Sequence, residues 1–455
     1  MENDNSHDTS HVFHFFLNRK YISIARAEGV YLYDDRGNRY IDASGGPILC
    51  NLGHGLEEMA DVIADQAKKV SYVHRIDFTN PPLEAAAQKL CHVSDDAMDK
   101  VFFVSGGTEA VEIGVKIARK YHLDNGNPSK IRVISRWQSY HGSTAGALAW
   151  TGATGRRSDF LPYLHDFTHI PPAYCYRCWF NKTPETCNLE CADALENEIM
   201  CLGPGNVSVF LAEPVSGMSL CGAVPKTGYF KRIREICNRY DVLLMFDEVM
   251  TGMGRTGKMF AYDHFDVVPD ILALGKGLGG GYFPIGAVAV PDYIHQKIAD
   301  NSGMFGAGHS WGGNPLGCAV VSKTIDYLVA HNLVERCRKM GEYLDHRLQD
   351  LRAHPLVGDI RGKGLMRGIE FVKDKKTRKT LDPKYAFSAR VAAECMKQGM
   401  FIEYSGGCNR GQSGDMIMFG PPFIITEAQI DAAVDILGQV LDKDLLSDNS
   451  SFLTF

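Results

Sequence analysis

Short apolar runs alternate with helix-length segments through the middle of the chain. The runs are VFFV at 101–104, IRVIS at 131–135, VSVFLAEPV at 207–215, VLLMFDEV at 242–249, ILALG at 271–275 and IGAVAV at 285–290. Their successive apolar positions are typical of strands that helices cover on both faces. Segments such as EAVEIGVKIARKYH and TGYFKRIREICNRY have a helical pattern and lie between them. The alternation predicts an α/β fold with a large, doubly wound, mostly parallel sheet.

The two flanks of this region have different patterns. VYLYDDRGNRYIDASGG, near the N-terminus, predicts a β-hairpin around its Asp-Arg-Gly-Asn turn. RGKGLMRGIEFV, GMFIEYSG and DMIMFGPPFIIT predict strands of a smaller α+β unit, followed by a last helix that starts at Thr426 with a capping box. We expect residues 1–70 to contribute to this small domain, 71–330 to form the large domain and 331–455 the C-terminal small domain. Residues 1–20 and 448–455 are expected to be flexible.

Length and charge narrow the possible functions. A chain of 455 residues is too long for one core, so two domains are expected. The net charge of −6 gives no electrostatic reason to expect a nucleic acid or an anionic membrane as partner. No apolar run approaches the ~20 residues of a membrane span, and the polar, acidic start does not have the pattern of a signal peptide. We therefore expect a cytoplasmic enzyme.

Small and charged residues follow the carboxyl ends of the predicted strands, where ligands bind in open α/β sheets. Ser-Gly-Gly-Thr-Glu-Ala at 105–110 follows the first strand, and Ser-Tyr-His-Gly at 139–142 comes after the second. Glu213, Asp247 and Lys276 stand at the ends of the next three. One edge of the sheet would thus hold a phosphate cradle, an aromatic ring, two carboxylates and an amine.

Each of these features also has a simpler interpretation. The Ser-Gly-Gly-Thr stretch could be a helix cap, or its free N–H groups could hold a phosphate. Tyr140 could be a core aromatic. Asp247 is harder to dismiss, because a carboxylate is rarely buried without a partner. Lys276 could lie along the surface, but an ammonium beside a core strand tends to lose its proton and become a nucleophilic amine.

The glycines around Lys276 match G-x-G-x-x-G from Gly275 to Gly280. A dinucleotide loop should follow the first strand and open a helix, whereas these glycines come late and lead into another apolar strand. The Walker sequence is absent. We interpret the glycines as a tight fold around the lysine.

Pyridoxal phosphate requires an amine for its aldehyde, a carboxylate for its ring nitrogen, a phosphate cradle and a stacking aromatic. Lys276 would also move a proton as general base.

The chain resembles the class III aminotransferases of pyridoxal-phosphate fold type I over about residues 20–440. The resemblance is carried, in order, by SGGTEA, SYHG, AEPV, FDEVMTGMGRTGK, PDILALGKGLGGGYFPIGA and HSWGGNPLG. Within the family it is most similar to the ω-amino acid and amine:pyruvate transaminases. The resemblance implies ping-pong transfer of an amino group from an amine donor to a keto acid such as pyruvate. An aminomutase or decarboxylase on the same scaffold is the alternative, and a nicotinamide dehydrogenase is the competing class.

The resemblance also implies a role for each matched residue. Lys276 matches the Schiff-base lysine and Asp247 the partner of the pyridine nitrogen. The residues matched to the rest of the cofactor site are Val249 and Tyr140 on the two ring faces, His141 beside Tyr140, Glu213 near the 3′-oxygen, and Gly106, Gly107 and Thr108 around the phosphate. Ser310 takes the place of a threonine that reaches the phosphate from a neighbouring subunit, and Trp311 lies where an aromatic is usual. A homodimer is therefore expected, with a tetramer left open.

Two positions bear on the substrate. Met418 lies where relatives that use ornithine or 4-aminobutyrate have an arginine, whereas Arg410 is at about the place of the mobile arginine of ω-transaminases. Arg410 could clamp a carboxylate or be an exposed loop residue. Ile48 replaces a tryptophan of amine-accepting relatives, which suggests a roomier or differently shaped pocket.

The chain has thirteen cysteines, most of them in apolar surroundings. Cys175, Cys178, Cys187 and Cys191 instead form C-x2-C-x8-C-x3-C. This spacing suits four thiolates on one zinc ion, but the family's chemistry needs no metal. Zinc, free thiols and disulfides all stay open for the quartet, and no metal is expected in the active site.

Overall fold

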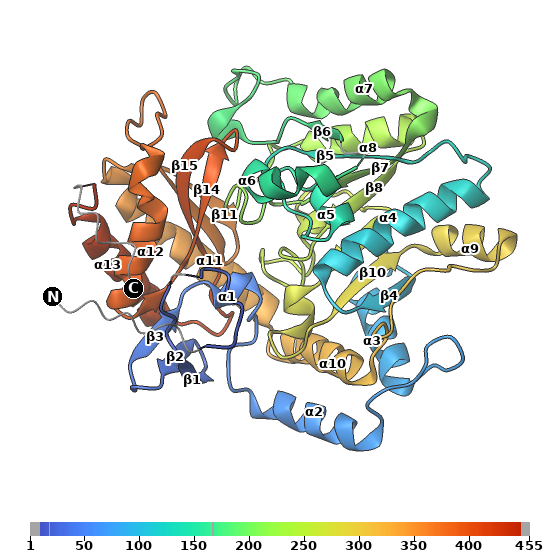
Figure 1. The fold of residues 1–455 in the computed structure, drawn as a ribbon, viewed down its shortest axis with the longest axis horizontal. Coiled ribbons are helices and arrows are strands. Elements are labelled where there is room, and N and C mark those ends of the chain that lie inside the picture. Colours follow the sequence, from blue (N-terminus) through green and yellow to red (C-terminus); the bar gives the residue numbers. More distant parts are fainter. Residues whose placement is uncertain (1–9, 18, 166–167, 447–455) are drawn as a thin grey trace.

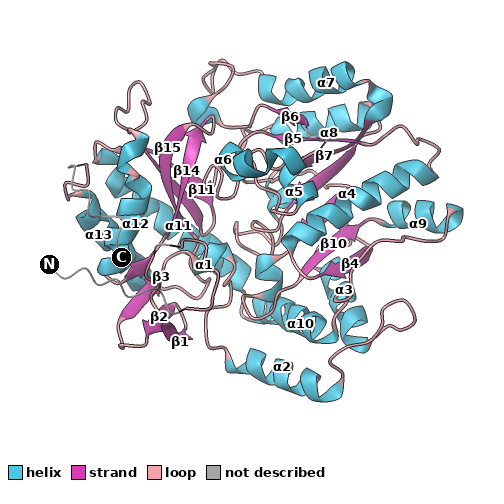
Figure 2. Ribbon diagram, in the orientation of Figure 1, coloured by secondary structure: helices cyan, strands magenta, loops and turns pink. Residues whose placement is uncertain are grey.

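The computed structural model describes residues 10–17, 19–165 and 168–446, which form three β-sheets with helices around them (Figure 1; Figure 2). Residues 10–17 form neither helix nor strand. Residues 1–9, 18 and 448–455, which we expect to be flexible, lie outside the described residues. The expected domain boundaries at residues 70 and 330 remain a prediction. No described helix is both long and apolar enough to cross a membrane.

The largest sheet has seven strands in the order β4-β10-β9-β8-β7-β5-β6. Its strands are β4 (Lys100–Val104), β5 (Arg132–Arg136), β6 (Thr168–Ile170), β7 (Val207–Ala212), β8 (Leu243–Asp247), β9 (Ile271–Leu274) and β10 (Gly286–Val290). Only β10 runs antiparallel to its neighbours, β4 and β9. The mostly parallel sheet and its six predicted strands are confirmed, while β6 was not predicted.

Alternate residues of the central strands enter two different cores. Val209, Leu211 and Met245 face a core shared with α4 (Gly107–Asp124). Phe210 and Phe246 face the opposite core, which includes the apolar side of α8 (Tyr229–Arg239). Both faces of each strand are therefore covered, which is why the strands appear in the sequence as continuous apolar runs.

The remaining helices around the large sheet precede, separate or follow its strands in the sequence. They are α2 (Glu57–Lys69), α3 (Pro81–His92), α5 (Ala145–Trp150), α6 (Thr154–Arg157), α7 (Glu190–Leu202), α9 (Asp292–Asn301) and α10 (Pro315–Ala330). Helix α10 packs on α2 and α3 (Figure 1). Between β9 and β10 the chain makes only a short 3-10 turn, Lys276–Gly279, so this glycine loop opens no α-helix, as expected.

An antiparallel sheet of four strands forms the second unit in the order β11-β12-β15-β14. Its strands are β11 (Val357–Lys363), β12 (Met366–Phe371), β14 (Glu403–Asn409) and β15 (Ser413–Phe419), and α11 (Leu333–Asp350), α12 (Phe387–Lys397) and α13 (Glu427–Leu441) lie near it. Helix α13 begins after Thr426, whose side chain accepts from the N–H of Gln429 while the Gln429 side chain accepts from the N–H of Thr426. The predicted capping box is therefore confirmed.

The third sheet joins the two ends of the chain. Strands β1 (Ile24–Glu28), β2 (Tyr31–Asp34) and β3 (Arg39–Asp42) are antiparallel and include the predicted hairpin. Strand β13 (Met400–Phe401) adds to β3 in parallel, with Met400 opposite Ile41. In Figure 1 the blue N-terminal strands accordingly lie beside the orange and red C-terminal elements. The short segment α1 (Gly45–Ile48) follows β3 and leads toward the large sheet.

Candidate active site

Lys276 lies two residues after the end of β9, and the backbone around it is tightly packed. Its own φ of 44° lies in the left-handed region. A Cβ on the preceding Gly275 would lie 3.0 Å from the Cα of Gly107 and 3.2 Å from Cγ1 of Val249. A side chain at this position would require its neighbours to shift. The close approach brings the segment with Lys276 to the residues that follow β4 and β8.

The Lys276 side chain is half-buried among acidic groups. Burial lowers the pKa of its ammonium to about 8, although Asp247, Glu213 and Glu403 favour the charged form. The shift has the direction expected for an amine beside a core strand. A much larger fraction of this amine is therefore neutral near pH 7 to 8 than of an ordinary exposed lysine.

Asp247, the last residue of β8, is held in place by two donors. Nδ1 of His141 lies 2.8 Å from its Oδ2, and the N–H of Val249 donates to its Oδ1 over 3.1 Å. The N–H of His141 donates to Oγ1 of Thr151, which fixes the backbone that carries the ring. Both ring and carboxylate are buried. The other ring nitrogen of His141, Nε2, is buried without a hydrogen-bond partner in the described structure.

Gly106 and Gly107 open α4 immediately after β4. Gly106 is the N-cap, and no side chain caps the first N–H groups of this 18-residue helix. The positive end of the helix dipole and these N–H groups suit an anion. A Cβ on Gly107 would lie 2.5 Å from Cγ1 of Val249, and one on Gly142 would lie 2.7 Å from Oγ1 of Thr108. The cradle is therefore built from residues that leave the backbone accessible.

Tyr140 and Glu213 lie at the same edge of the sheet. The Tyr140 ring is half-buried, and the guanidinium of Arg156, on α6, lies 5.0 Å from its centre. Glu213 is buried after β7 and accepts from the N–H of Gly217 over 3.1 Å. Burial raises the pKa of the Glu213 carboxyl, and the nearby Asp247 adds to this rise.

The predicted substrate residues lie in three different settings. Ile48 is only 1% exposed and packs against Gly420, with a left-handed φ of 61°. Arg410 is exposed in the turn of the β14–β15 hairpin, and its guanidinium lies 5.1 Å from the ring centre of Trp179. Trp311 is 60% exposed. In this single chain, Arg410 and Trp311 are therefore on the surface.

Ser310 is also exposed, and no hydrogen bond of its hydroxyl occurs within the described residues. The next residue, Trp311, is one of several exposed large apolar side chains. Tyr72 packs edge-on against Trp311, and Ile76 and Met304 are 81% and 68% exposed. The preceding residue, His309, lies close to the proposed cradle, because its Nε2 accepts from the N–H of Ser105 over 3.2 Å.

Two charged residues near Lys276 were not predicted. Glu403 is the first residue of β14, and Arg156 lies on α6; both act electrostatically on Lys276. Burial raises the pKa of Glu403, whereas Lys276 and Arg156 lower it. The available signal was the single carboxylate in the otherwise uncharged segment FIEYSG.

The four clustered cysteines are free thiols in the structure. Cys175 begins a 3-10 turn, and Cys191 lies in the first turn of α7. Burial raises the pKa of Cys191 to about 12, with the neighbouring thiols contributing. Within the described residues, the only metal-compatible set of three ligand atoms within 4.8 Å of one another comes from Asp42, Cys50 and His54 and excludes the quartet.

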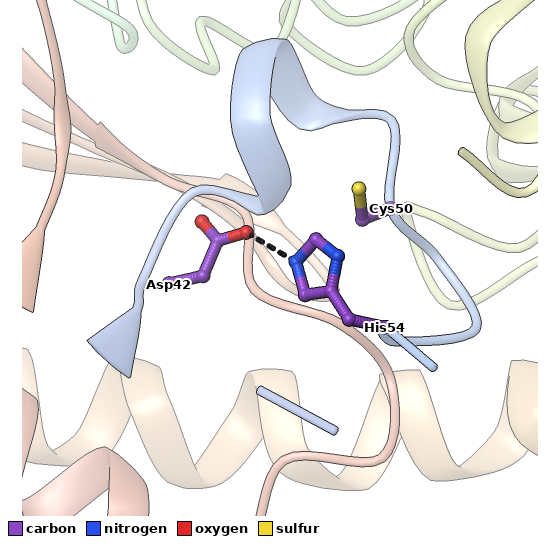
Figure 3. A group of neighbouring side chains, drawn as sticks. All are labelled: Asp42, Cys50 and His54. Atoms are coloured by element: carbon purple, nitrogen blue, oxygen red, sulfur yellow. Dashed lines mark hydrogen bonds and ion pairs between the residues drawn. The ribbon is translucent and has the colours of Figure 1, made fainter. Parts of the chain in front are cut away.

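Figure 3 shows this unpredicted trio beside α1. Nε2 of His54 lies 2.9 Å from Oδ2 of Asp42, whose Oδ1 accepts from the N–H of Gly45 over 2.6 Å. Burial raises the pKa of the Cys50 thiol to about 12. Because a metal binds the thiolate rather than the thiol, these contacts favour a hydrogen-bonded brace for the loop over a metal centre.

Comparison with known proteins identifies relatives along almost the whole chain. The family model described as aminotransferase class-III matches residues 17–441. An uncharacterised aminotransferase of Bacillus subtilis is 36% identical, with 95% of this chain and 98% of the relative covered. The putrescine–pyruvate aminotransferase of Pseudomonas aeruginosa is 33% identical, with coverage of 92% and 90%.

Solved structures give the same result. A thermostable (S)-enantioselective omega-transaminase from Thermomicrobium roseum superposes with a TM-score of 0.89 at 33% identity. The match covers 96% of this chain and 97% of that one. A Bacillus anthracis aminotransferase superposes with a TM-score of 0.88 at 32% identity over 95% of each chain.

Proposed function

Since the chain belongs to the class III aminotransferases, we propose that it transfers an amino group from an ω-amino acid or amine to a keto acid such as pyruvate. The proposed cofactor is pyridoxal 5′-phosphate, and the two substrates react in separate half-reactions. The observation that carries the proposal is the half-buried amine of Lys276, with its lowered pKa, beside Asp247 and the α4 N-terminus. The names of the putrescine–pyruvate aminotransferase and the omega-transaminase among its relatives support the choice of substrates.

The residues present fit the proposed cofactor. When bound, pyridoxal phosphate supplies an aldehyde for amines and a protonated ring that accepts electrons. The α4 N-terminus, with Gly106, Gly107 and Thr108, would hold the phosphate, because its first N–H groups lack a side-chain cap. The buried Nε2 of His141 lacks a partner within the described residues, which supports a polar group that completes this site.

The other residues would orient the ring and its substituents. Asp247 would hold a proton at the ring nitrogen, and His141 would keep the Asp247 carboxylate in place by donating from Nδ1. Val249 and Tyr140 would cover the two ring faces. The buried Glu213 would lie on the side of the 3′-oxygen. Each assignment uses a side chain at the carboxyl edge of the sheet.

Lys276 would serve both as the attachment point and as the base that moves a proton. Its neutral amine is the nucleophilic form, and burial increases the fraction of that form. An amine whose pKa is about 8 is also well matched to proton transfer near neutral pH. We propose that Arg410 binds the carboxylate of the keto acid, and that Ile48 and Trp311 shape the substrate pocket.

We further propose a homodimer in which the Ser310 hydroxyl reaches the phosphate site of the partner subunit. Ser310 is next to the exposed Trp311, Ile76 and Met304 are exposed as well, and burying such apolar side chains would favour association. Sedimentation would distinguish a dimer from a tetramer. A dimer whose Ser310→Ala variant retains assembly but binds the cofactor less tightly would support the shared site, whereas a monomer would contradict it.

The decisive experiment is a panel of amine donors against pyruvate and 2-oxoglutarate, with Lys276→Ala as the inactive control. A yellow reconstituted protein that converts donor only when a keto acid is present would support transamination. Product formation without an acceptor would favour the aminomutase or decarboxylase alternative. A protein that stays colourless with pyridoxal phosphate would contradict the proposal.

A further inference from the structure

We propose that Glu403 binds a positively charged group of the amine donor at a distance from the reacting nitrogen, so that the preferred donors are diamines. The inference rests on the proposed transaminase function and names the donor class. It starts from Glu403, a half-buried carboxylate that is close enough to Lys276 to act on it electrostatically. Its side chain forms no hydrogen bond or ion pair with a described residue.

The backbone of Glu403 is fixed from two sides. Its N–H donates to Oγ of Ser44 over 2.8 Å, and that hydroxyl donates to the carbonyl of Met418 over 2.7 Å. Ser44 is fully buried. Glu403 is also paired with Met418 across the β14–β15 hairpin. The segments that contain Ser44, Glu403 and Met418 therefore fix the backbone position of Glu403.

The side chain of Glu403 has no hydrogen bond or ion pair with any residue that the structure describes. Other buried glutamates are partnered. Glu370 contacts both Arg177 and Arg361, and Glu248 accepts from the N–H groups at 261 and 262. The half-buried carboxylate of Glu403 keeps part of its contact with water, and a cation from a ligand can replace that water. Glu403 therefore has a binding capacity that the chain itself does not use.

None of the charged groups around Glu403 is a fixed ion-pair partner for its carboxylate. Lys276 has a lowered pKa and, in the proposed function, its amine is committed to the cofactor. Arg156 directs its guanidinium toward the Tyr140 ring and is exposed. Asp42 adds a further negative charge nearby. The site therefore favours a cation from the substrate and disfavours an anion at the same place.

This charge pattern selects among the possible amines. A monoamine uses its only nitrogen in the reaction and has no ammonium left for Glu403. An ω-amino acid would bring a carboxylate toward Glu403 and be repelled. A diamine retains a second ammonium, which can form a charge-assisted hydrogen bond with the Glu403 carboxylate. Among donors of similar length, the diamine should therefore bind most tightly.

The first test uses the unmodified holoenzyme with pyruvate and three donors of matched length: 1,4-diaminobutane, 4-amino-1-butanol and 4-aminobutyrate. We expect kcat/KM to fall in that order, with the diamine ahead of the amino alcohol by about tenfold or more. Equal values, or a preference for 4-aminobutyrate, would overturn the inference. Failure to transaminate any amine would instead contradict the proposed function.

The second test compares Glu403→Gln with the original residue, using Glu235→Gln on the exposed face of α8 as a matched control. Glu403→Gln should raise KM for 1,4-diaminobutane by about tenfold or more relative to KM for n-butylamine, whatever change in kcat the two amines share. Bound-cofactor absorbance should stay the same. Equal losses with both amines, or altered absorbance, would mean that Glu403 positions Lys276 rather than binding the donor, and would overturn the inference.

Discussion

Nδ1 of His141 lies 2.8 Å from Oδ2 of Asp247, and both side chains are buried beneath the edge of the large sheet. A carboxylate accepts but does not donate, so the histidine carries the proton on Nδ1 when Asp247 is ionised. This hydrogen bond connects the loop after β5 to the end of β8. The other ring nitrogen of His141, Nε2, is buried and has no hydrogen-bond partner among the described residues.

His141→Leu should lower kcat by about 10- to 100-fold, which is typical when the partner that orients a functional group is lost. The protein should still bind the cofactor, because the α4 cradle and Lys276 remain. Steady-state kinetics and absorbance of the bound cofactor test this. His295→Leu, on the exposed side of α9, is the control. Wild-type kcat in His141→Leu would show that Asp247 does not need this partner.

Gly107→Ala should weaken cofactor binding, because the added Cβ would lie 2.5 Å from Cγ1 and 2.8 Å from Cγ2 of Val249. Removing those methyl groups with Val249→Ala should relieve the clash. We therefore expect the double variant to bind the cofactor more tightly than Gly107→Ala alone, measured by absorbance titration. If the loss of cofactor affinity in the double variant equals the sum of the losses in the two single variants, the contact with Val249 does not cause the weaker binding.

Cofactor loading should depend on pH through Lys276. Burial lowers the pKa of its ammonium to about 8, and only the neutral amine attacks an aldehyde. The rate of absorbance growth after pyridoxal phosphate is added to the apoenzyme should rise with pH and level off above about 8. For an exposed lysine, with a pKa of about 10.4, the rise would continue by more than two further pH units. A rate that still increases steeply at pH 10 would contradict the assignment.

Arg410→Ala should raise KM for pyruvate by about tenfold, because the proposed carboxylate clamp is lost. Bound-cofactor absorbance and KM for an amine donor should change little. Arg378→Ala is a close control, since Arg378 is also exposed and its guanidinium lies 5.0 Å from the Tyr176 ring. If both substitutions raise KM for pyruvate equally, the cause is the loss of a surface charge rather than of a specific contact of Arg410.

The fold was predictable where sequence pattern and environment agree. Met245 and Phe246 are adjacent in β8 yet enter different cores, so the strand is apolar throughout and stands out in the sequence. Strand β6 was missed because its three residues are too few to form a pattern. The α/β fold class and the aminotransferase family were both predicted from the sequence and are confirmed.

The site was predictable only in part. Asp247 ends one apolar strand and Lys276 lies two residues after another, so the local sequence reveals both. Glu403 is different, because its position depends on Ser44, far away in the sequence, and on the pairing of β14 with β15. Arg410 depends on the same hairpin, which here holds it against Trp179 on the surface. Long-range packing of this kind has no signature in residue spacing.

The parallel pairing of Ile41 with Met400 has a consequence for the order of folding during synthesis. About 360 residues separate the two strands, and a ribosome adding roughly 5–20 residues per second needs about 20–70 s to make them. The β2–β3 hairpin therefore cannot pair with β13 until that time has passed. Glu403 follows β13 by two residues, so the part of the site that carries it is added only after the large sheet has been translated.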